Sequence, residues 1–191
     1  MTIAAALLLA LLQTSPAPGV AAERVARCGL GRVTARYVEV LQSEILEVVD
    51  AADPTDAQLA CADSAADPYM VAFPPAVQQR FDAIRRARES VAAAAHARDW
   101  LSARGLLARV PRYEPGKTDD AVFARRAESL CGARARGALQ TQAGPHVVGP
   151  EWLAGAIQAG DSGSDAIQCL LNVTTAAGFR IGFVGNEAFA D

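Results

Sequence analysis

Residues 74–105 read "PPAVQQRFDAIRRARESVAAAAHARDWLSARG" and form the longest element that the sequence predicts. From Ala76 to about Ala103, hydrophobic side chains recur at steps of three and four residues, which is the spacing of one face of an α-helix. These side chains are Val77, Phe81, Ile84, Val91, Ala95 and Leu101. The two prolines suit the first turn, where a missing N–H has no partner to lose, and Gly105 marks the end. The stretch predicts a long amphipathic helix against which the rest of the fold packs.

Three shorter helices are predicted, one before the long helix and two after it. In "DPTDAQLACADSAAD" (53–67), Thr55 and Gln58 have the spacing of a capping box, and Pro68 follows the helix. In "TDDAVFARRAESLCG" (118–132), Thr118 is the predicted N-cap and the acidic residues after it favour the first turn. The third helix is predicted in "PEWLAGAIQAG" (150–160).

Alternating hydrophobic residues predict strands at the two ends of the chain. Val33, Ala35 and Tyr37 alternate with polar neighbours, and extended structure is expected to continue to about Val49. Near the C-terminus, alternation over 167–174 and over 179–183 predicts a β-hairpin with a three-residue loop at 176–178. We therefore expect an α+β fold, in which the N-terminal strand and the C-terminal hairpin form a small antiparallel sheet packed against the helices.

Composition sets limits on the class of protein. The chain has 191 residues, of which 51% are hydrophobic and 20% charged, which is enough for one domain with a core. Its net charge of −3, from 21 acidic and 18 basic residues, argues against a nucleic-acid partner. Lys117 is the only lysine, and this bias towards arginine, with the abundance of alanine, indicates a GC-rich bacterial gene.

The N-terminus has the features of an export signal. The apolar run from Ile3 to Leu12 is too short to span a bilayer, and it is followed by polar residues and prolines. Val20 and Ala22 fit the small-residue rule for signal peptidase, so residues 1–22 are predicted to be a signal peptide and residues 23–191 a single mature domain. No Lys or Arg precedes the apolar run, which departs from the usual pattern.

The four cysteines support export. Cys28, Cys61, Cys131 and Cys169 are an even number with no Cys-x-x-Cys spacing, which predicts two disulfides in an oxidising compartment. Three connectivities are possible. We favour Cys61–Cys131, between two helices, and Cys28–Cys169, between two strand regions. The expected location is the periplasm or the cell exterior, with no membrane span after signal cleavage.

Two short motifs point to a hydrolase. "GDSGS" at 160–164 resembles the nucleophile loop of chymotrypsin-like serine proteases, and "AAAAHARDW" resembles the residues around the catalytic histidine of that family. The resemblance implies Ser162 as nucleophile and His96 as base, with Asp119 or Asp120 as the carboxylate between them. His146 is a second candidate for the base.

The setting of these motifs argues against that resemblance. His96 falls in the long helix, whereas the protease family is built from β-barrels, and Ser164 replaces the second glycine of the motif. We therefore interpret "GDSGS" as a polar turn that leads into the C-terminal hairpin. A small secreted serine hydrolase using Ser162 with His96 or His146 stays as the alternative function.

The remaining residues suggest binding rather than catalysis. Two histidines are too few for a usual metal site, so no metal or cofactor is expected. Arginines cluster at 85–88, 125–126 and 134–136, which suits either an anionic partner or a solvated helix face, and we favour the second. The favoured function is a non-enzymatic exported domain that binds an envelope protein or a small anionic ligand and is stabilised by two disulfides.

Overall fold

The computed structural model describes residues 16–50, 52–141 and 144–183. The chain divides into two compact units, residues 1–88 and residues 89–191, where the sequence predicts a single domain over 23–191. We call them the N-terminal and C-terminal units and describe each by itself. The α+β class is confirmed, because helices and short strands occur together in the described residues.

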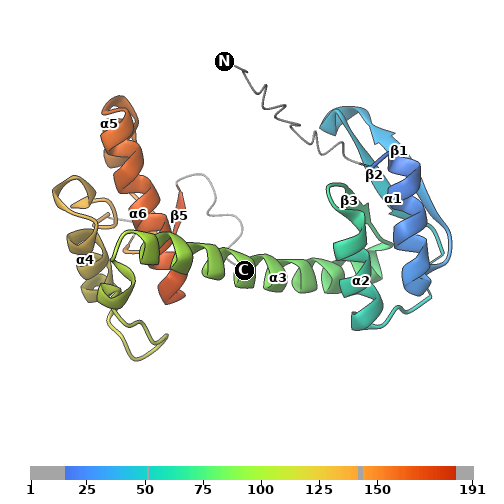
Figure 1. The fold of residues 1–191 in the computed structure, drawn as a ribbon, viewed down its shortest axis with the longest axis horizontal. Coiled ribbons are helices and arrows are strands. Elements are labelled where there is room, and N and C mark those ends of the chain that lie inside the picture. Colours follow the sequence, from blue (N-terminus) through green and yellow to red (C-terminus); the bar gives the residue numbers. More distant parts are fainter. Residues whose placement is uncertain (1–15, 51, 142–143, 184–191) are drawn as a thin grey trace, which may run out of the picture. The chain divides into compact units, whose positions relative to one another are not determined.

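A three-stranded sheet lies in the N-terminal unit. It consists of β1 (Val33–Val38), β2 (Ser43–Val48) and β3 (Met70–Ala72), in the order β1-β2-β3 (Figure 1). β1 and β2 are antiparallel and joined by a tight turn, whereas β2 and β3 are parallel. The predicted extended region up to Val49 is therefore a hairpin, and the sheet is mixed rather than purely antiparallel.

Helices cover this sheet and close the N-terminal core. They are α1 (Pro18–Val25), α2 (Asp56–Ala66) and the first part of α3 (Pro75–Ala103). Leu46 and Val48 of β2 are buried together with Leu59 of α2 and Phe81 of α3. Ile45, next to Leu46, is buried as well, so both faces of β2 are covered at this point, because successive side chains of a strand point to opposite faces.

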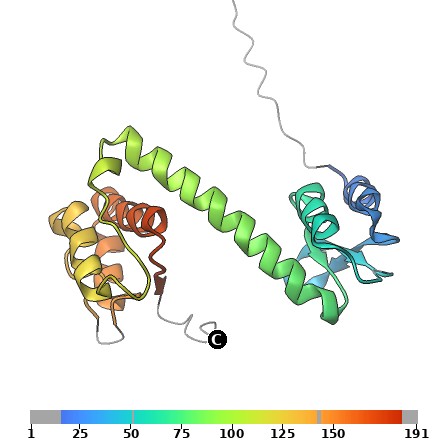
Figure 2. The same cartoon turned by 90° about the horizontal axis from the view of Figure 1, so that it is seen from below.

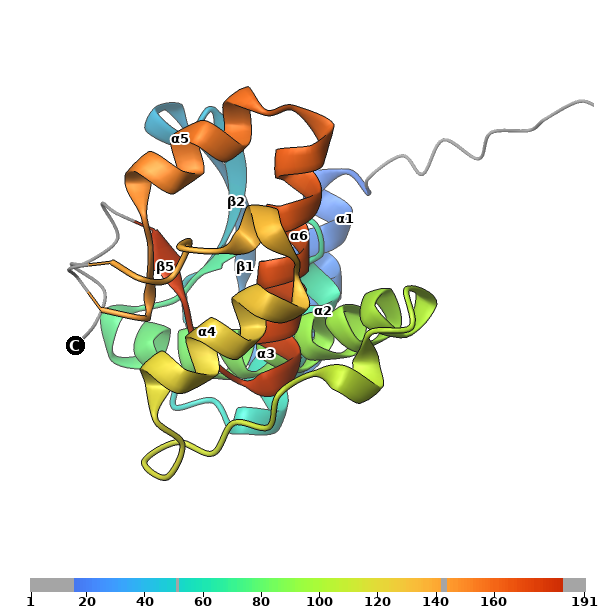
Figure 3. The ribbon, with the colours of Figure 1, turned by 90° about the vertical axis from the view of Figure 1, so that its left-hand side faces the viewer.

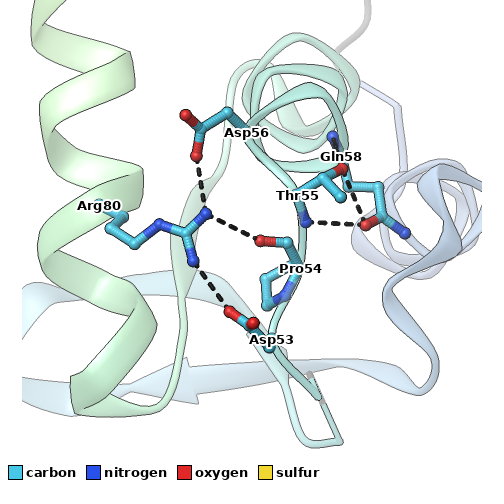
Figure 4. Close-up of polar contacts among 6 residues, drawn as sticks. All are labelled: Asp53, Pro54, Thr55, Asp56, Gln58 and Arg80. Carbon is cyan, nitrogen blue, oxygen red and sulfur yellow. Dashed lines mark hydrogen bonds and ion pairs between the residues drawn. The ribbon is translucent and has the colours of Figure 1, made fainter.

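A polar cluster fixes the loop before α2 (Figure 4). Thr55 and Gln58 form the predicted capping box: the Gln58 backbone N–H donates to Thr55 Oγ1 at 3.3 Å, and the Thr55 backbone N–H donates to Gln58 Oε1 at 2.9 Å. Arg80 of α3 donates to Asp53, to the Pro54 carbonyl and to Asp56 at 2.8–3.1 Å. The hydrogen bond to Asp56 and the nearby negative charges raise the pKa of Arg80 despite some loss of solvation, so the guanidinium stays charged and holds α3 to this loop.

The C-terminal unit is mainly helical (Figure 3). Its elements are the end of α3, α4 (Asp120–Leu130), β4 (Val147–Val148), α5 (Pro150–Gln158), α6 (Asp161–Ala177) and β5 (Gly182–Phe183). β4 and β5 form a two-stranded parallel sheet. Its core contains Leu101, Phe123, Val173 and Phe179.

The predicted C-terminal β-hairpin is wrong. Residues 161–177 form helix α6, and of the second predicted strand only Gly182–Phe183 is extended, beside β4. The buried residues of α6 are spaced as on one helical face, namely Gly163, Ala166, Cys169, Leu170, Asn172, Val173 and Thr174. The same segment also alternates at every second residue, and packing decided between the two periodicities.

The prediction of two disulfides is confirmed, but the favoured pairing is wrong. Cys28 bonds Cys61 and Cys131 bonds Cys169. Each bridge therefore lies within one unit. Cys28, in the helical turn Ala26–Leu30 after α1, is joined to α2, and Cys131, at the end of α4, is joined to α6. The pairs favoured from the sequence would each have joined the two units.

The long helix is confirmed with the predicted end, and it runs unbroken from Pro75 to Ala103 (Figure 2). Its apolar stripe is not buried throughout: Phe81 and Leu101 are buried, whereas Val91 is 72% exposed. The N-cap of α4 is Asp119 rather than the predicted Thr118, since the Asp119 carboxylate accepts from the Val122 N–H at 2.8 Å.

The predicted signal peptide falls partly outside the described residues. Residues 1–15 are not described, and residues 18–22 belong to α1. Ala21 and Ala22 are buried in the N-terminal core beside Val25. Tyr69 also donates to the Pro16 carbonyl at 2.7 Å, so the fold begins before the predicted cleavage point.

Candidate functional site

The "GDSGS" motif forms the first turn of α6 rather than a loop before a strand. Gly160 precedes the helix, and the N–H groups of Gly163 and Ser164 both donate to the Gly160 carbonyl at 3.0 Å. Ser162 donates through Oγ to the Ala159 carbonyl at 3.1 Å. The serine hydroxyl thus closes the turn between α5 and α6.

Gly163 sets how closely α5 and α6 approach. A Cβ atom at this position would lie 1.8 Å from the Ala156 carbonyl oxygen, so no larger residue fits without moving the backbone. Gly163 and Ala156 are both buried where the two helices meet. Gly163 thus serves helix packing, and Gly160 supplies the positive φ of 63° before α6; the resemblance to a nucleophile loop indicated neither role.

His146 lies elsewhere in the C-terminal unit, and both of its ring nitrogens are engaged. Nδ1 lies 2.8 Å from the Arg180 carbonyl oxygen, and Nε2 lies 2.9 Å from Asp120 Oδ2. The ring stacks on Phe179 with a centroid separation of 4.4 Å. A carbonyl and a carboxylate only accept hydrogen bonds, so both contacts are satisfied together when both nitrogens carry a proton, which favours the imidazolium form.

The surrounding charges favour that state. Burial of the ring opposes a charge on His146, but the hydrogen bonds to Arg180 and Asp120 outweigh it and raise its pKa above 6.5. Hydrogen bonds from His146 and Tyr113 lower the pKa of the Asp120 carboxyl below 3.8. The bond from Tyr113 to Asp120, 2.9 Å long, also raises the pKa of the tyrosine. These hydrogen bonds therefore favour the charged forms of His146 and Asp120 together.

This cluster joins segments that are far apart in the sequence, and it leaves no free imidazole nitrogen. Tyr113 precedes α4, Asp120 begins it, His146 precedes β4 and Arg180 precedes β5. A general base needs a nitrogen that can accept a proton from substrate, and both nitrogens of His146 are already engaged by Asp120 and Arg180. We conclude that His146 clamps the end of α6 and the β5 segment to α4.

The structure does not bring the predicted hydrolase residues together. His96 is exposed on α3, and His146 is held by Asp120 and Arg180. In residues 16–50, 52–141 and 144–183, no hydrogen bond joins Ser162 to either histidine. Of the carboxylates considered with them, Asp120 contacts His146, and Asp119 caps α4.

The C-terminal unit has a pocket between α5 and the first turn of α6. Its volume is about 280 Å³, and it is lined by Arg134, Glu151, Trp152, Gly155, Ala156, Ala159 and Gly163. The Trp152 indole N–H donates to the Arg134 carbonyl at 2.9 Å, which fixes the ring against the short turn before it in sequence. The floor is apolar, and Arg134 and Glu151 add one charge of each sign.

The sequence analysis did not predict this pocket, because most of the residues that line it are glycine and alanine. Arg134 stands out in the sequence only as part of an arginine cluster, and no pattern marks Trp152 as a pocket residue. The available signal was the set of small residues at 154–156, 159 and 160, followed by Gly163, which indicates two helices in close contact.

The described part of the chain contains no group of side chains that could bind a metal ion. There, no three His, Cys, Asp or Glu side chains lie together as a metal ion would require. Among the same residues, no helix is both long and apolar enough to cross a membrane.

No protein-family model, curated protein or solved structure matches this chain.

Proposed function

We propose that this chain is an exported, non-enzymatic binding protein of the periplasm or cell exterior. The observation that supports export is the state of the cysteines, all four of which are in disulfides. Such bridges persist where no thiol pool reduces them. The apolar run over 3–12 would supply the export signal.

The pocket between α5 and α6 supports the binding role. Its volume of about 280 Å³ is at the small end for ligand sites, so it suits a molecule the size of an amino acid. Trp152 and the alanine floor favour an apolar group, Arg134 favours a carboxylate, and Glu151 favours an ammonium group. We therefore propose a small zwitterion with an apolar side chain as the ligand class.

Export is tested by the redox state of the chain in its own cell. Cells expressing the full chain are fractionated and treated with a maleimide that adds mass to free thiols, before and after reduction. We expect the chain in the periplasm or medium, unmodified until it is reduced. Recovery in the cytosol with four reactive thiols would overturn the proposal.

Binding is tested by tryptophan fluorescence in a Trp100→Phe variant, in which Trp152 is the only tryptophan left. Leucine and phenylalanine should change its emission, whereas their amides, which lack the carboxylate, should bind more weakly. Arg134→Gln should weaken binding by about tenfold or more, because a charge-assisted hydrogen bond is lost. Arg136→Gln, an exposed arginine outside the pocket, is the matched control. Equal weakening in both variants, or no response to any zwitterion, would contradict the proposed ligand class.

A further inference from the structure

β1 forms one edge of the sheet in the N-terminal unit (Figure 1). Four consecutive residues, Thr34 to Tyr37, are exposed, so side chains on both faces of this strand reach solvent. Tyr37 is 55% exposed, and Val40 in the following turn is 93% exposed. An edge strand of this kind presents unpaired backbone groups on which another strand can pair.

The register shows which backbone groups are unpaired. Arg32 and Val49 lie opposite each other, and the Val49 N–H donates to the Arg32 carbonyl at 3.0 Å. Bonded and non-bonded pairs alternate along an antiparallel ladder, and this ladder continues without a bulge to Val38. Thr34, Arg36 and Val38 therefore bond to β2.

It follows that Val33, Ala35 and Tyr37 direct their N–H and C=O groups away from β2. Among the described residues, no hydrogen bond joins these groups to any other element. The free edge thus consists of three residues at alternate positions, with Ala35 in the middle.

A second copy of β1 fits this edge in antiparallel orientation. The two-fold axis of such a pair lies midway between two copies of one residue, and an axis at Ala35 is the one that pairs all three outward-directed residues with those of the second copy. This register sets Ala35 against Ala35 of the second copy, Val33 against its Tyr37, and Thr34 against its Arg36. An aromatic residue opposite a β-branched one is a favourable cross-strand pair.

The charges agree with this register. Arg36 faces a threonine rather than another arginine, and its own charge is balanced by Glu47 at 3.0 Å. At the axis two alanines meet, so no bulky group keeps the backbones apart. No pair of like charges lies directly opposite over residues 33–37.

We propose that two copies of this chain associate through β1, antiparallel about a two-fold axis at Ala35, so that the three strands of each copy continue into one sheet. The paired stretch is short, and it buries less area than a standard protein interface. The dimer therefore depends on protein concentration. This interface lies in the N-terminal unit and does not involve the α5–α6 pocket, so it holds whether or not that pocket binds a ligand.

Cross-linking tests the register. Directly opposed residues of a bonded pair have Cα atoms about 5.5 Å apart, within the range of a disulfide. Ala35→Cys should give a covalent dimer on a non-reducing gel under mild oxidation. Thr34→Cys, one position away and equally exposed, faces Arg36 and should stay monomeric on the same gel. Equal cross-linking of both variants, or none in either, would contradict the register.

Charge substitutions test the interface without a covalent bond. Ala35→Glu places two carboxylates face to face and should raise the dimer Kd by at least about tenfold. Thr34→Glu places a carboxylate opposite Arg36 of the second copy and should preserve or tighten the dimer. Sedimentation velocity over a concentration series measures both, and circular dichroism confirms that each variant folds. A wild-type chain that stays monomeric throughout the series overturns the proposal.

Discussion

At the scale of single residues, the His146–Asp120 pair links stability to pH. The pKa of His146 is raised above 6.5, because its hydrogen bonds outweigh the effect of burial, and the pKa of Asp120 is lowered below 3.8. A raised histidine pKa gives stability that is complete below 6.5 and is lost as pH rises through the folded value. A lowered aspartate pKa gives stability that is present above 3.8 and is lost as pH falls through the folded value. The pair stabilises the fold fully between these two limits.

We therefore expect His146→Gln to lower the melting temperature most near pH 5 and progressively less as the pH rises through the raised pKa of His146. Tyr113→Phe is the control, because it removes a hydrogen bond to Asp120 but leaves the ion pair in place. Melting curves of the three proteins between pH 4 and pH 9 measure the gap. A gap for His146→Gln that stays constant over this range would show that the pair does not carry the pH dependence.

Glu128 is a second charged residue with a structural role, since its carboxylate holds the segment 137–140. Its buried carboxylate accepts hydrogen bonds from the N–H groups of Gly137 and Leu139 and from the Gln140 side chain, at 2.6–3.1 Å. Glu128→Gln would turn an NH₂ group towards these donors, so we expect a loss of about 2 kcal/mol in the free energy of unfolding. Urea denaturation measures this loss. Asp99→Asn, at an exposed position on α3, should be neutral, and an equal loss there would contradict the role of Glu128.

At the scale of elements, two glycines in the α5–α6 pair give opposite predictions. Gly163→Ala would place a methyl group 1.8 Å from the Ala156 carbonyl oxygen, so α5 and α6 must separate and the protein should be strongly destabilised. Gly155 lies within α5, and a Cβ there meets nothing within 4 Å. Gly155→Ala should therefore stabilise by about 0.5–1 kcal/mol through helix propensity. The melting temperatures of both variants test these predictions. An unchanged melting temperature for Gly163→Ala would refute the close packing of α5 and α6.

Helix α1 conflicts with the predicted cleavage after Ala22. A chain that begins at Glu23 loses two buried alanines and the hydrogen bond from Tyr69 to Pro16. We expect the free energy of unfolding of such a chain to be about 2 kcal/mol lower than that of a chain that begins at Pro16. Most of this loss comes from the two buried methyl groups, and the hydrogen bond adds a smaller part. Equilibrium unfolding of the two chains tests this, and the intact mass of the exported protein gives its actual N-terminus. Equal stabilities would show that α1 is dispensable.

Local signals in the sequence predicted several helices and failed at the C-terminal hairpin. The capping box at Thr55 and the stripe through Phe81 and Leu101 each correspond to a helix in the structure. The segment after Gly160 satisfies two periods at once, since Cys169 and Val173 belong both to an alternating set and to a helical face. Contacts with α5 and the bridge to Cys131 favour the helix, and neither is visible in a local pattern.

The candidate site was out of reach of sequence reasoning for a related reason. Its walls are formed by Ala156, Ala159 and Gly163, which are small residues that carry no chemical signature of their own. Ser162 and His146 do carry such a signature, but both have structural roles: Ser162 closes the turn between α5 and α6, and His146 holds the segment before β5. A pocket produced by packing is found only when the packing is known.

At the scale of the whole molecule, each unit has its own core and its own disulfide. Cys28–Cys61 closes the N-terminal unit and Cys131–Cys169 closes the C-terminal unit, with sequence separations of 33 and 38 residues. Cross-links over loops of this length stabilise by about 4 kcal/mol in the chain-entropy account. Because both ends of each bridge lie within one unit, its contribution should be local.

We expect the double substitution Cys28→Ser with Cys61→Ser to speed amide hydrogen exchange in β1, β2 and α2 while leaving α4 and α6 protected. The pair Cys131→Ser with Cys169→Ser should give the reverse pattern, so each variant is the control for the other. Hydrogen exchange read by mass spectrometry of peptides assigns the change to one unit or to both. If either variant loses protection equally throughout the described residues, the two units unfold as one cooperative body, and the locality of the bridges is refuted.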